Sequence, residues 1–272
     1  MQINGSTEIY GIIGNPVAHS LSPIMHNSAF EALGLNKAYV PFPATNVEKA
    51  LAGCRALGVR GLSVTIPHKE TVLAHINSID PVAEKIGAVN TLVSDEEKNI
   101  HGLNTDWIGA NRALEDKLDL QGKRILLLGA GGSAKAIGFG LLEAGAQVTL
   151  ASRTESRLET LANILQCDSL PLAEIDCVQA DVLINATSVG MKLIGDVSLV
   201  PCACLANFQV VMDIVYSPLE TKLLREAKSS GCEVINGLSM LLYQGVAQFE
   251  VWTDQDAPVE VMRTALMNMI EK

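Results

Sequence analysis

A glycine-rich stretch in the middle of the chain has the residue types and spacing that bind the phosphates of a dinucleotide. In KRILLLGAGGSAKAIG (123–138), four apolar residues predict a buried strand that ends at Gly129, and Gly131 and Ala134 follow at the fingerprint spacing. Gly129 permits a tight turn, Gly131 lets a pyrophosphate approach the backbone, and Ala134 lets a helix pack closely on the strand. The phosphates then contact free N–H groups at the helix N-terminus. The alternative is a tight turn that binds no ligand.

Two arginines follow the next predicted strand, AQVTLAS, where a dinucleotide fold meets the adenosine ribose. Arg153 lies 22 residues after Gly131, at the place where NAD enzymes usually carry an acidic residue. The nearest acid here is Glu155, and Arg153 and Arg157 flank it. A guanidinium suits a 2′-phosphate through paired, charge-assisted hydrogen bonds, so the sequence favours NADP over NAD. The alternative is that both arginines are surface residues of the following helix.

Two serines stand where the first predicted helix begins. In NPVAHSLSP, Ser22 precedes a proline, which is the pattern of a helix N-cap followed by proline at the first helical position. Ser20 and Ser22 place two hydroxyl groups beside the helix N-terminus, where a small carboxylate binds well. Local sequence leaves two interpretations open for Ser22, a helix cap and a carboxylate ligand.

A lysine and an aspartate of the amino-terminal half could transfer a proton. The segment GLSVTI (61–66) predicts a strand in which Ser63 and Thr65 point to one face, and Lys69 follows the strand's carboxyl end, where ligands gather in α/β sheets. Asp106 comes directly before a predicted helix. The default interpretations are a solvated lysine and a capping aspartate. The sharper hypothesis pairs Lys69 with Asp106.

The elements that position these residues predict an α/β protein of two domains. Further strands are expected at 8–14, in AYVPFPA and in VNTLVS, the last carrying Asn90, and a helix is expected to begin near Trp107. A new series of strand–helix–strand units starts with the fingerprint strand, and two helices close the chain after the last strand. These two helices need a surface to pack on, so we expect them to return to the first domain. The predicted domains are residues 1–106 with 238–272, and residues 107–237.

Composition restricts the partners. The 272 residues include 48% apolar and 18% charged residues with a net charge of −10, which argues against nucleic acid and anionic membranes. The chain has no apolar run long enough for a bilayer and no signal-peptide pattern at its start. The six cysteines and five histidines show neither a disulfide framework nor metal-ligand spacing. We therefore expect a cytoplasmic protein with a small-molecule substrate and no metal, and leave room for a homodimer.

Eight motifs taken together resemble the shikimate dehydrogenase family. They are SLSPIMHN, SVTIPHK, AVNTL, NTDWIG, GAGGSAKA, NATSVGM, MDIVYSP and GLSMLLYQG, and they span nearly the whole chain in order. The resemblance implies a substrate-binding α/β domain, a Rossmann-type NADP domain and carboxyl-terminal helices that return to the first domain. It also implies the reversible NADPH-dependent reduction of 3-dehydroshikimate to shikimate, a step of aromatic amino-acid biosynthesis.

The resemblance also assigns roles to individual residues. It implies that Lys69 and Asp106 are the acid–base pair. Two residues depart from the pattern: Ser63 stands where many members carry Asn, and Ser152 stands where Asn often precedes the arginine, so the choice between shikimate and quinate is open at Ser63. The implied substrate ligands are Ser20 and Ser22 for the carboxylate, Ser63, Thr65, Asn90, Asp106 and Gln244 for the hydroxyls and reacting oxygen, and Tyr216 beside them. The implied cofactor ligands are Gly129, Ala130, Gly131, Gly132 and Ser133 for the pyrophosphate, Ser152, Arg153, Thr154 and Arg157 for the adenosine phosphate, and Ile214 and Gly237 beside the nicotinamide.

Two other functions are alternatives to this one. One is a quinate/shikimate dehydrogenase with relaxed substrate or cofactor use. The other is a non-catalytic NADP-binding regulator built on the same fold, against which the joint presence of Lys69, Asp106 and Gln244 counts.

Overall fold

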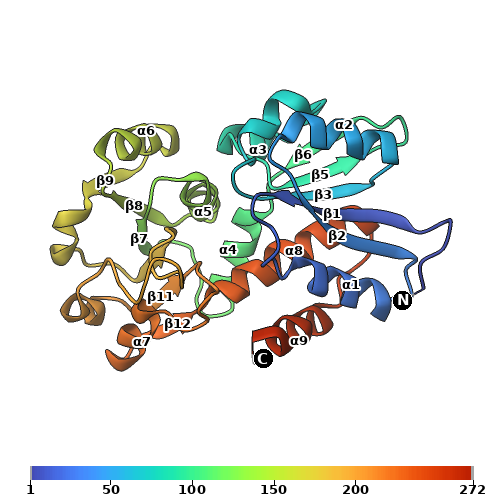
Figure 1. The fold of residues 1–272 in the computed structure, drawn as a ribbon. Coiled ribbons are helices and arrows are strands. Elements are labelled where there is room, and N and C mark those ends of the chain that lie inside the picture. Colours follow the sequence, from blue (N-terminus) through green and yellow to red (C-terminus); the bar gives the residue numbers. More distant parts are fainter. Residues whose placement is uncertain (1, 271–272) are drawn as a thin grey trace. The chain divides into compact units, whose positions relative to one another are not determined.

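The chain divides into two compact units, each with its own sheet (Figure 1). The computed structural model describes residues 2–270. Unit 1 comprises the described residues up to Thr105 together with those from Gln244 onward, and unit 2 comprises Asp106–Tyr243. The predicted boundaries lie after residues 106 and 237, so the first turns of the long helix α8 (Gly237–Thr253) belong to unit 2.

Unit 1 is built on a mixed six-stranded sheet of order β2-β1-β3-β5-β6-β4. Strands β1, β2 and β3 run parallel, whereas β5 is antiparallel to both β3 and β6. The sheet lies between helix α2 on one face and helices α1 and α8 on the other (Figure 1). The strands are β1 (Glu8–Gly14), β2 (Lys37–Pro43), β3 (Gly61–Val64), β4 (Ser78–Ile79), β5 (Thr91–Ser94) and β6 (Ile100–Leu103), and the helices are α1 (Ser22–Ala32), α2 (Val47–Leu57), α3 (Pro81–Ile86) and α9 (Val259–Ile270).

The two faces of this sheet carry different side chains, because successive residues of a strand point to opposite faces. Leu62 and Val64 of β3 pack with Leu51 of α2 in an aliphatic core. Ser63 lies on the opposite face, where rings from α1, the strands and α8 form an aromatic cluster. The cluster consists of Tyr10, His26, Phe30, Tyr39, Phe249 and Trp252. Helix α9 packs on α1, and this confirms that the carboxyl-terminal helices return to the first domain.

Unit 2 is a doubly wound parallel sheet of order β12-β11-β10-β7-β8-β9. This is the Rossmann order, in which β7 is the first strand: β8 and β9 are added on one side of β7, and β10, β11 and β12 on the other, so the strand order reverses between β7 and β10. The strands are β7 (Arg124–Leu128), β8 (Gln147–Ser152), β9 (Asp168–Pro171), β10 (Val182–Asn185), β11 (Val210–Asp213) and β12 (Glu233–Ile235). The helices besides α8 are α4 (Asp106–Glu115), α5 (Gly132–Glu143), α6 (Glu155–Leu165) and α7 (Lys222–Ser229), and short 3-10 helices lie at Thr71–His75 in unit 1 and at Leu172–Cys177 and Cys202–Asn207 in unit 2.

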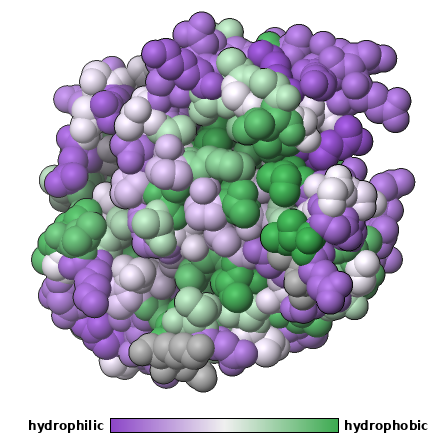
Figure 2. All heavy atoms as spheres, turned by 45° about the vertical axis from the view of Figure 1, so that its right-hand side comes forward, coloured by the Kyte–Doolittle hydropathy of each residue, from purple (hydrophilic) through white to green (hydrophobic). Residues whose placement is uncertain are grey.

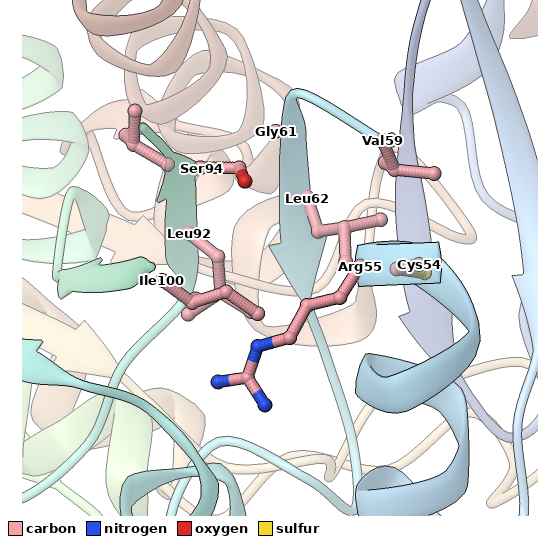
Figure 3. Close-up of a pocket in the computed structure, with 9 residues that line it drawn as sticks. Cys54, Arg55, Val59, Gly61, Leu62, Leu92, Ser94 and Ile100 are labelled. Atoms are coloured by element: carbon pink, nitrogen blue, oxygen red, sulfur yellow. The ribbon is translucent and has the colours of Figure 1, made fainter. Parts of the chain in front are cut away.

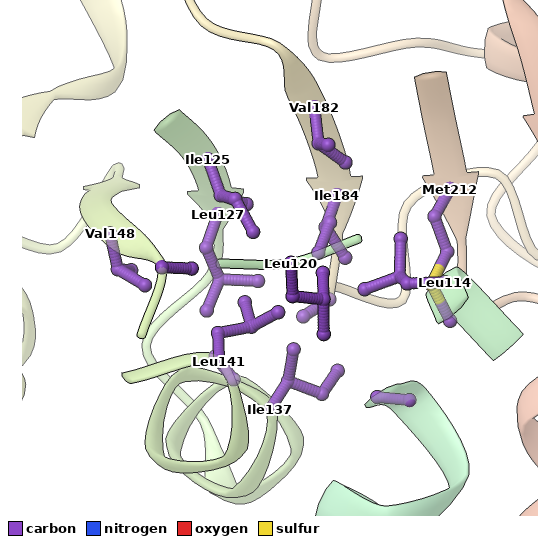
Figure 4. Close-up of a cluster of buried hydrophobic side chains, with 14 of the residues drawn as sticks. Leu114, Leu120, Ile125, Leu127, Ile137, Leu141, Val148, Val182, Ile184 and Met212 are labelled. Carbon is purple, nitrogen blue, oxygen red and sulfur yellow. The ribbon is translucent and has the colours of Figure 1, made fainter. Parts of the chain in front are cut away.

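The core of unit 2 explains why its central strands read as continuous apolar runs. Ile125 and Leu127 of β7 face α5 with Ile137 and Leu141, in the cluster of Figure 4. Leu126 and Leu128 face the other side, in a second core cluster. Both faces of β7 are therefore covered. For this reason its sequence is continuously hydrophobic and does not alternate between apolar and polar residues.

Several sequence predictions are corrected by the structure. Strand β3 ends at Val64 rather than Ile66, and helix α4 begins at Asp106 itself. The short strands β4 and β9 were not predicted, because β4 has only two residues and the sequence of β9, DSLP, does not alternate apolar and polar residues. Among the helices within residues 2–270, none has the length and apolar character needed to span a membrane.

Candidate functional site

The glycine turn of unit 2 lies at the point where the sheet order reverses. Gly129 has φ +121°, a conformation that side chains rarely adopt, and a Cβ there would approach the carbonyl oxygen of Ala186 to 3.0 Å. Ala186 follows strand β10, so the turn lies at the carboxyl ends of the two adjacent strands β7 and β10. Ligands of open α/β sheets bind at this reversal point.

The start of α5 has room for an anion. Gly131 is the N-cap of α5, and the helix has no side-chain capping bond there. A Cβ built on Gly131 would meet nothing within 4 Å, so the space above the helix N-terminus is open. The first N–H groups of a helix have no intrahelical acceptor, and a phosphate satisfies them. These residues therefore fit a pyrophosphate.

The predicted ribose-phosphate ligands follow the neighbouring strand. Strand β8 pairs with β7, and the N–H of Gly129 donates to the carbonyl of Ala151 at 2.8 Å. Ser152 ends β8, and α6 begins two residues after Arg153. Arg153, Thr154 and Arg157 are exposed, so their side chains are accessible to a charged ligand.

The structure brings Ile214 and Gly237 together, as expected for two residues that border one ligand. A Cβ on Gly237 would overlap the carbonyl group of Ile214. Asp213 fixes the backbone next to Ile214. Its carboxylate accepts from the N–H of Val215 at 3.0 Å and from the Thr221 hydroxyl at 2.7 Å. Burial raises the pKa of Asp213 to about 6 against the lowering effect of these bonds. Burial also raises the pKa of Tyr216.

Asp213 and its partner Asn185 hold the segment that carries Ile214, and neither was predicted as a site residue. Asn185 donates to the Asp213 carboxylate at 3.0 Å, and its own oxygen accepts from the Thr187 hydroxyl at 2.7 Å. Both residues end buried parallel strands, β10 and β11. A polar residue at the end of an apolar run is the signal that would have found them.

In unit 1 the two serines of the first helix lie together, but Ser22 is not the helix cap. The N-cap is Leu21, without a side-chain capping bond, and Ser22 is the first residue of α1. Ser20 Oγ accepts from the N–H of Ser22 at 3.3 Å. Ser22 is buried, and burial strongly raises the pKa of the neighbouring Tyr39. The capping interpretation is therefore wrong, and carboxylate binding by Ser22 stays a prediction.

Main-chain bonds gather the predicted residues around Lys69. The carbonyl of Lys69 accepts from the N–H of Val89 at 2.8 Å, and the carbonyl of Asn90 accepts from the N–H of Val64 at 2.8 Å. The N–H of Thr65 donates to the carbonyl of Ile13 at 3.0 Å, which holds Thr65 at the end of β1. Lys69, Thr65 and Asn90 therefore lie at neighbouring strand ends.

Asn90 is oriented by Thr105, the residue before Asp106 in the chain. The N–H of Thr105 donates to Asn90 Oδ1 at 2.8 Å, and Asn90 Nδ2 donates to the Thr105 hydroxyl at 3.0 Å. Asp106 itself is buried and is the first residue of α4. Because Lys69 and Asp106 belong to different units, their pairing stays a prediction.

Gln244 is buried on α8, and Gln248 lies one turn further along the same helix. Gln248 was not predicted as a functional residue, although its spacing from Gln244 places both on one helix face. Its amide contacts Ser63, Asn90 and Thr91, and Ser63 in turn contacts Tyr39. Gln248 thus connects two predicted substrate ligands, Ser63 and Asn90, in one buried polar network that Ser63 extends to Tyr39.

A small cavity in unit 1 lies apart from these residues. It measures about 10 Å³, room for about one water molecule, between α2 and strands β3 and β5 (Figure 3). The Arg55 guanidinium beside it donates to the carbonyl of His75 and to Asn77. None of the predicted ligands lines it; the lining residues are Cys54, Arg55, Val59, Gly61, Leu62, Leu92, Val93, Ser94 and Ile100.

A serine, a histidine and an aspartate also form a chain of contacts at the surface of unit 1. Ser78 Oγ lies 2.5 Å from His101 Nδ1, and His101 Nε2 lies 3.1 Å from the Asp95 carboxylate. In serine hydrolases Nε2 faces the serine and Nδ1 the buried carboxylate, so the ring nitrogens here are used in the opposite order. The hydrogen bond with His101 lowers the pKa of Asp95. We interpret the array as a surface contact between β4, β6 and the turn before β6.

Three family models match successive parts of the chain. The shikimate dehydrogenase substrate binding domain matches residues 12–92, shikimate/quinate 5-dehydrogenase matches residues 110–216, and the shikimate 5′-dehydrogenase C-terminal domain matches residues 237–267. The matches cover segments of both units.

Full-length relatives and solved structures agree with these models. A Pyrococcus furiosus protein named shikimate dehydrogenase (NADP(+)) is 48% identical over 263 residues, which are 96% of each chain. A crystal structure of a shikimate dehydrogenase in complex with NADP+ has a TM-score of 0.92 at 41% identity and covers 100% of this chain and 98% of its own. A shikimate 5-dehydrogenase from Thermus thermophilus, in complex with NADP(H) and shikimate, has a TM-score of 0.90 at 38% identity and covers 96% of this chain and 99% of its own.

Proposed function

The chain belongs to the shikimate dehydrogenase family, and we propose on that basis that it catalyses the reversible NADPH-dependent reduction of 3-dehydroshikimate to shikimate. One observation carries the proposal: a single chain combines an open glycine turn for a dinucleotide with a buried set of hydroxyl and amide groups beside a lysine. The first binds a hydride carrier and the second a polyhydroxylated ring. In biosynthesis this reaction belongs to the route to aromatic amino acids.

The residues of unit 2 fit NADP. Gly129, Ala130, Gly131, Gly132 and Ser133 would hold the pyrophosphate, because the turn is open and α5 presents its N–H groups there. Arg153 and Arg157, with Ser152 and Thr154, would hold the 2′-phosphate, and Ile214 and Gly237 would border the nicotinamide. The bound cofactor supplies or accepts the hydride.

The residues of unit 1 supply most of the groups for shikimate. Ser20 and Ser22 would bind the carboxylate, and their proximity supports this assignment. Ser63, Thr65, Asn90 and Gln244 would bind ring hydroxyls, with Asp106 and Tyr216 of unit 2. Buried amides that are already oriented reject a ring lacking the matching hydroxyl, because they would be left unpaired.

Proton transfer falls to the Lys69–Asp106 pair. During reduction the carbonyl oxygen gains negative charge, and the Lys69 ammonium delivers a proton to it. In the oxidation of shikimate the neutral amine takes the hydroxyl proton. We assign the proton to the pair rather than to one member, because two closely coupled groups titrate together.

The direct test is the absorbance change of NADP on incubation with shikimate. We expect turnover, with kcat/KM for shikimate above that for quinate and for NADP above that for NAD. Comparable values in all four combinations would identify a quinate/shikimate dehydrogenase of relaxed choice. Binding of NADP without turnover of either acid would identify a regulator and overturn the proposal.

We also propose a cytoplasmic homodimer. The free thiols among the described cysteines, Cys54, Cys167, Cys202, Cys204 and Cys232, fit a reducing compartment. Figure 2 shows hydrophobic side chains gathered in the middle of one face with hydrophilic side chains around them. Exposed apolar residues on α8, on α9 and on or directly after α1 support a contact between copies; they are Ile24, Leu33, Val251, Val261, Met267 and Met269. Light scattering of the protein as it elutes from a size-exclusion column tests the dimer.

A further inference from the structure

Gln248 joins α8 to two strands of the unit 1 sheet through a single amide group. Its Oε1 lies 2.8 Å from Ser63 Oγ, and its Nε2 lies 3.1 Å from the carbonyl oxygen of Asn90 and 3.0 Å from Thr91 Oγ1. Gln248 is 1% exposed and Ser63 is 5% exposed. Little water competes for these bonds, so their donors and acceptors must match.

One main-chain carbonyl determines the direction of every bond in this group. The carbonyl of Asn90 can only accept, so the amide atom that faces it must be the nitrogen of Gln248. The oxygen of Gln248 must then face Ser63, and Ser63 must donate its single proton to it. Because that proton is used, Tyr39, whose hydroxyl lies 2.6 Å from Ser63 Oγ, must be the donor in their bond.

Ser63 is left able to accept but unable to donate. A hydroxyl group has one proton and two lone pairs. The proton goes to Gln248, one lone pair accepts from Tyr39, and one lone pair remains. A substrate group opposite Ser63 can bond only if it brings its own proton, as a ring hydroxyl does. A carbonyl or carboxylate oxygen there would place two acceptors face to face, which is costly in a buried site.

We propose that Gln248 is a specificity-determining positioning residue, which makes Ser63 a pure acceptor and so selects a substrate that presents a hydroxyl group at this position. The inference rests on the proposed function, in which Ser63 contacts the substrate. It assigns to Gln248 an action on the substrate through Ser63, without direct contact.

The other end of the network is held by aromatic packing. The ring of His26 stacks on the ring of Tyr39, with centroids 4.6 Å apart and planes 18° apart. Trp252 packs against both rings and donates its indole N–H to the carbonyl of Leu92 at 3.0 Å. Tyr39 is therefore held in place to donate to Ser63, and the lone pair directed at the substrate keeps one orientation.

Steady-state kinetics with shikimate and NADP test the inference through Gln248→Met. Methionine keeps the length of the side chain but cannot accept the Ser63 proton. We expect KM for shikimate to rise about 10-fold, the equivalent of one hydrogen bond, with kcat within about threefold and KM for NADP unchanged. Phe249→Leu, which removes packing beside Gln248 and no polar group, is the matched control and should lower thermal stability while leaving KM for shikimate unchanged.

A double-mutant cycle with Ser63→Ala separates positioning from general damage. If Gln248 acts through Ser63, adding Gln248→Met to Ser63→Ala causes little further rise in KM, since no hydroxyl is left to orient. Additive rises in KM, or an unchanged KM in Gln248→Met with lowered stability, would show a merely structural residue and overturn the proposal.

Gln248→Glu adds a pH readout that folding defects would not mimic. A protonated carboxyl can donate to the Asn90 carbonyl and accept from Ser63, whereas a carboxylate can do only the second. Repulsion between the carboxylate and the Asn90 carbonyl oxygen displaces the ionised side chain from Ser63, so the ratio of KM for shikimate between this variant and the wild type should fall toward 1 as pH is lowered. A ratio independent of pH would contradict the assigned bond directions, and absence of turnover in the wild type would remove the proposed function and this inference with it.

Discussion

The carbonyl group of Ile214 occupies the space that a side chain on residue 237 would need, so the start of α8 fits against the end of β11 only with glycine at position 237. This contact joins two residues assigned to the nicotinamide, and it suggests a test that changes neither member of the acid–base pair.

Gly237→Ala should displace Ile214 and weaken cofactor binding. We expect KM for NADP to rise by at least about 10-fold and the midpoint of thermal unfolding to fall, since backbone must move to admit the methyl group. Kinetics with varied NADP and a thermal scan check both. The control is Gly53→Ala in α2, where a Cβ meets nothing within 4 Å and helix propensity predicts a gain of about 1 kcal/mol. An unchanged KM for NADP in Gly237→Ala would separate this contact from the cofactor.

Lys69→Ala should abolish most proton transfer. We expect kcat to fall by at least ~10²-fold with little change in NADPH affinity, because the lysine acts on the reacting oxygen while the cofactor ligands lie in unit 2. Single-turnover kinetics and fluorescence titration with NADPH measure the two quantities. Turnover near the wild-type rate would take Lys69 out of the acid–base role.

Arg153→Glu should discriminate between the two nicotinamide cofactors. The new carboxylate repels a 2′-phosphate and can accept a hydrogen bond from a 2′-hydroxyl. We expect kcat/KM with NADP to fall at least about 10-fold more than kcat/KM with NAD. The exposed Glu159 of α6, the helix that follows Arg153, provides the control, Glu159→Gln, which should leave the cofactor preference intact. Equal losses with both cofactors would refute the 2′-phosphate assignment.

His26 should make unit 1 less stable in acid. Both ring nitrogens are buried without a well-formed hydrogen bond, and burial lowers the pKa of His26 from its ordinary value of 6.5 to about 3, against the raising effect of nearby Gln248. Between these values the unfolded chain binds the extra proton, so stability is complete above about pH 6.5 and falls by about 1.4 kcal/mol per unit as pH decreases. Denaturant unfolding at several pH values checks this. His26→Phe should remove the slope, and a retained slope would assign it to other groups.

Asp213 has the opposite effect of His26 on the pH dependence of stability between about pH 4 and pH 6. Its pKa is raised from the ordinary value of 3.8 to about 6 in the folded protein, so the folded state holds the proton longer and stability falls as pH rises from about 4 to about 6. The effects of His26 and Asp213 therefore oppose each other in that window. Denaturant unfolding between about pH 4 and pH 6 separates the two effects. In Asp213→Asn the free energy of unfolding should fall as pH decreases, because only the His26 effect is left; in His26→Phe it should fall as pH rises, because only the Asp213 effect is left.

The glycine turn and the strand and helix beside it were predictable from the sequence, because their signals are local. The strand, the turn at Gly129 and the helix starting at Gly132 lie within about twenty residues, and the structure confirms all three elements. The resemblance to the shikimate dehydrogenase family and the choice of NADP are confirmed by the relatives. The assignment of individual ligands stays a prediction.

The amino-terminal half was harder to predict, since its contacts are distant in sequence. Ser22 carries every local mark of a helix cap, yet it is the first helical residue and its side chain makes no capping bond. Ser63 and Gln248 are 185 positions apart, and no pattern around either one indicates that they meet.

By itself, the sequence determined the α/β class, the dinucleotide turn and the residues that bring charge and hydroxyl groups to the chemistry, because residue type and short-range spacing decide those features. Only the tertiary structure decided which strands adjoin, that a carbonyl at Ile214 requires a glycine at 237, and that Ser63 gives its proton to Gln248. The physical reason is that the direction of a hydrogen bond depends on every partner that surrounds it, and folding alone brings those partners together.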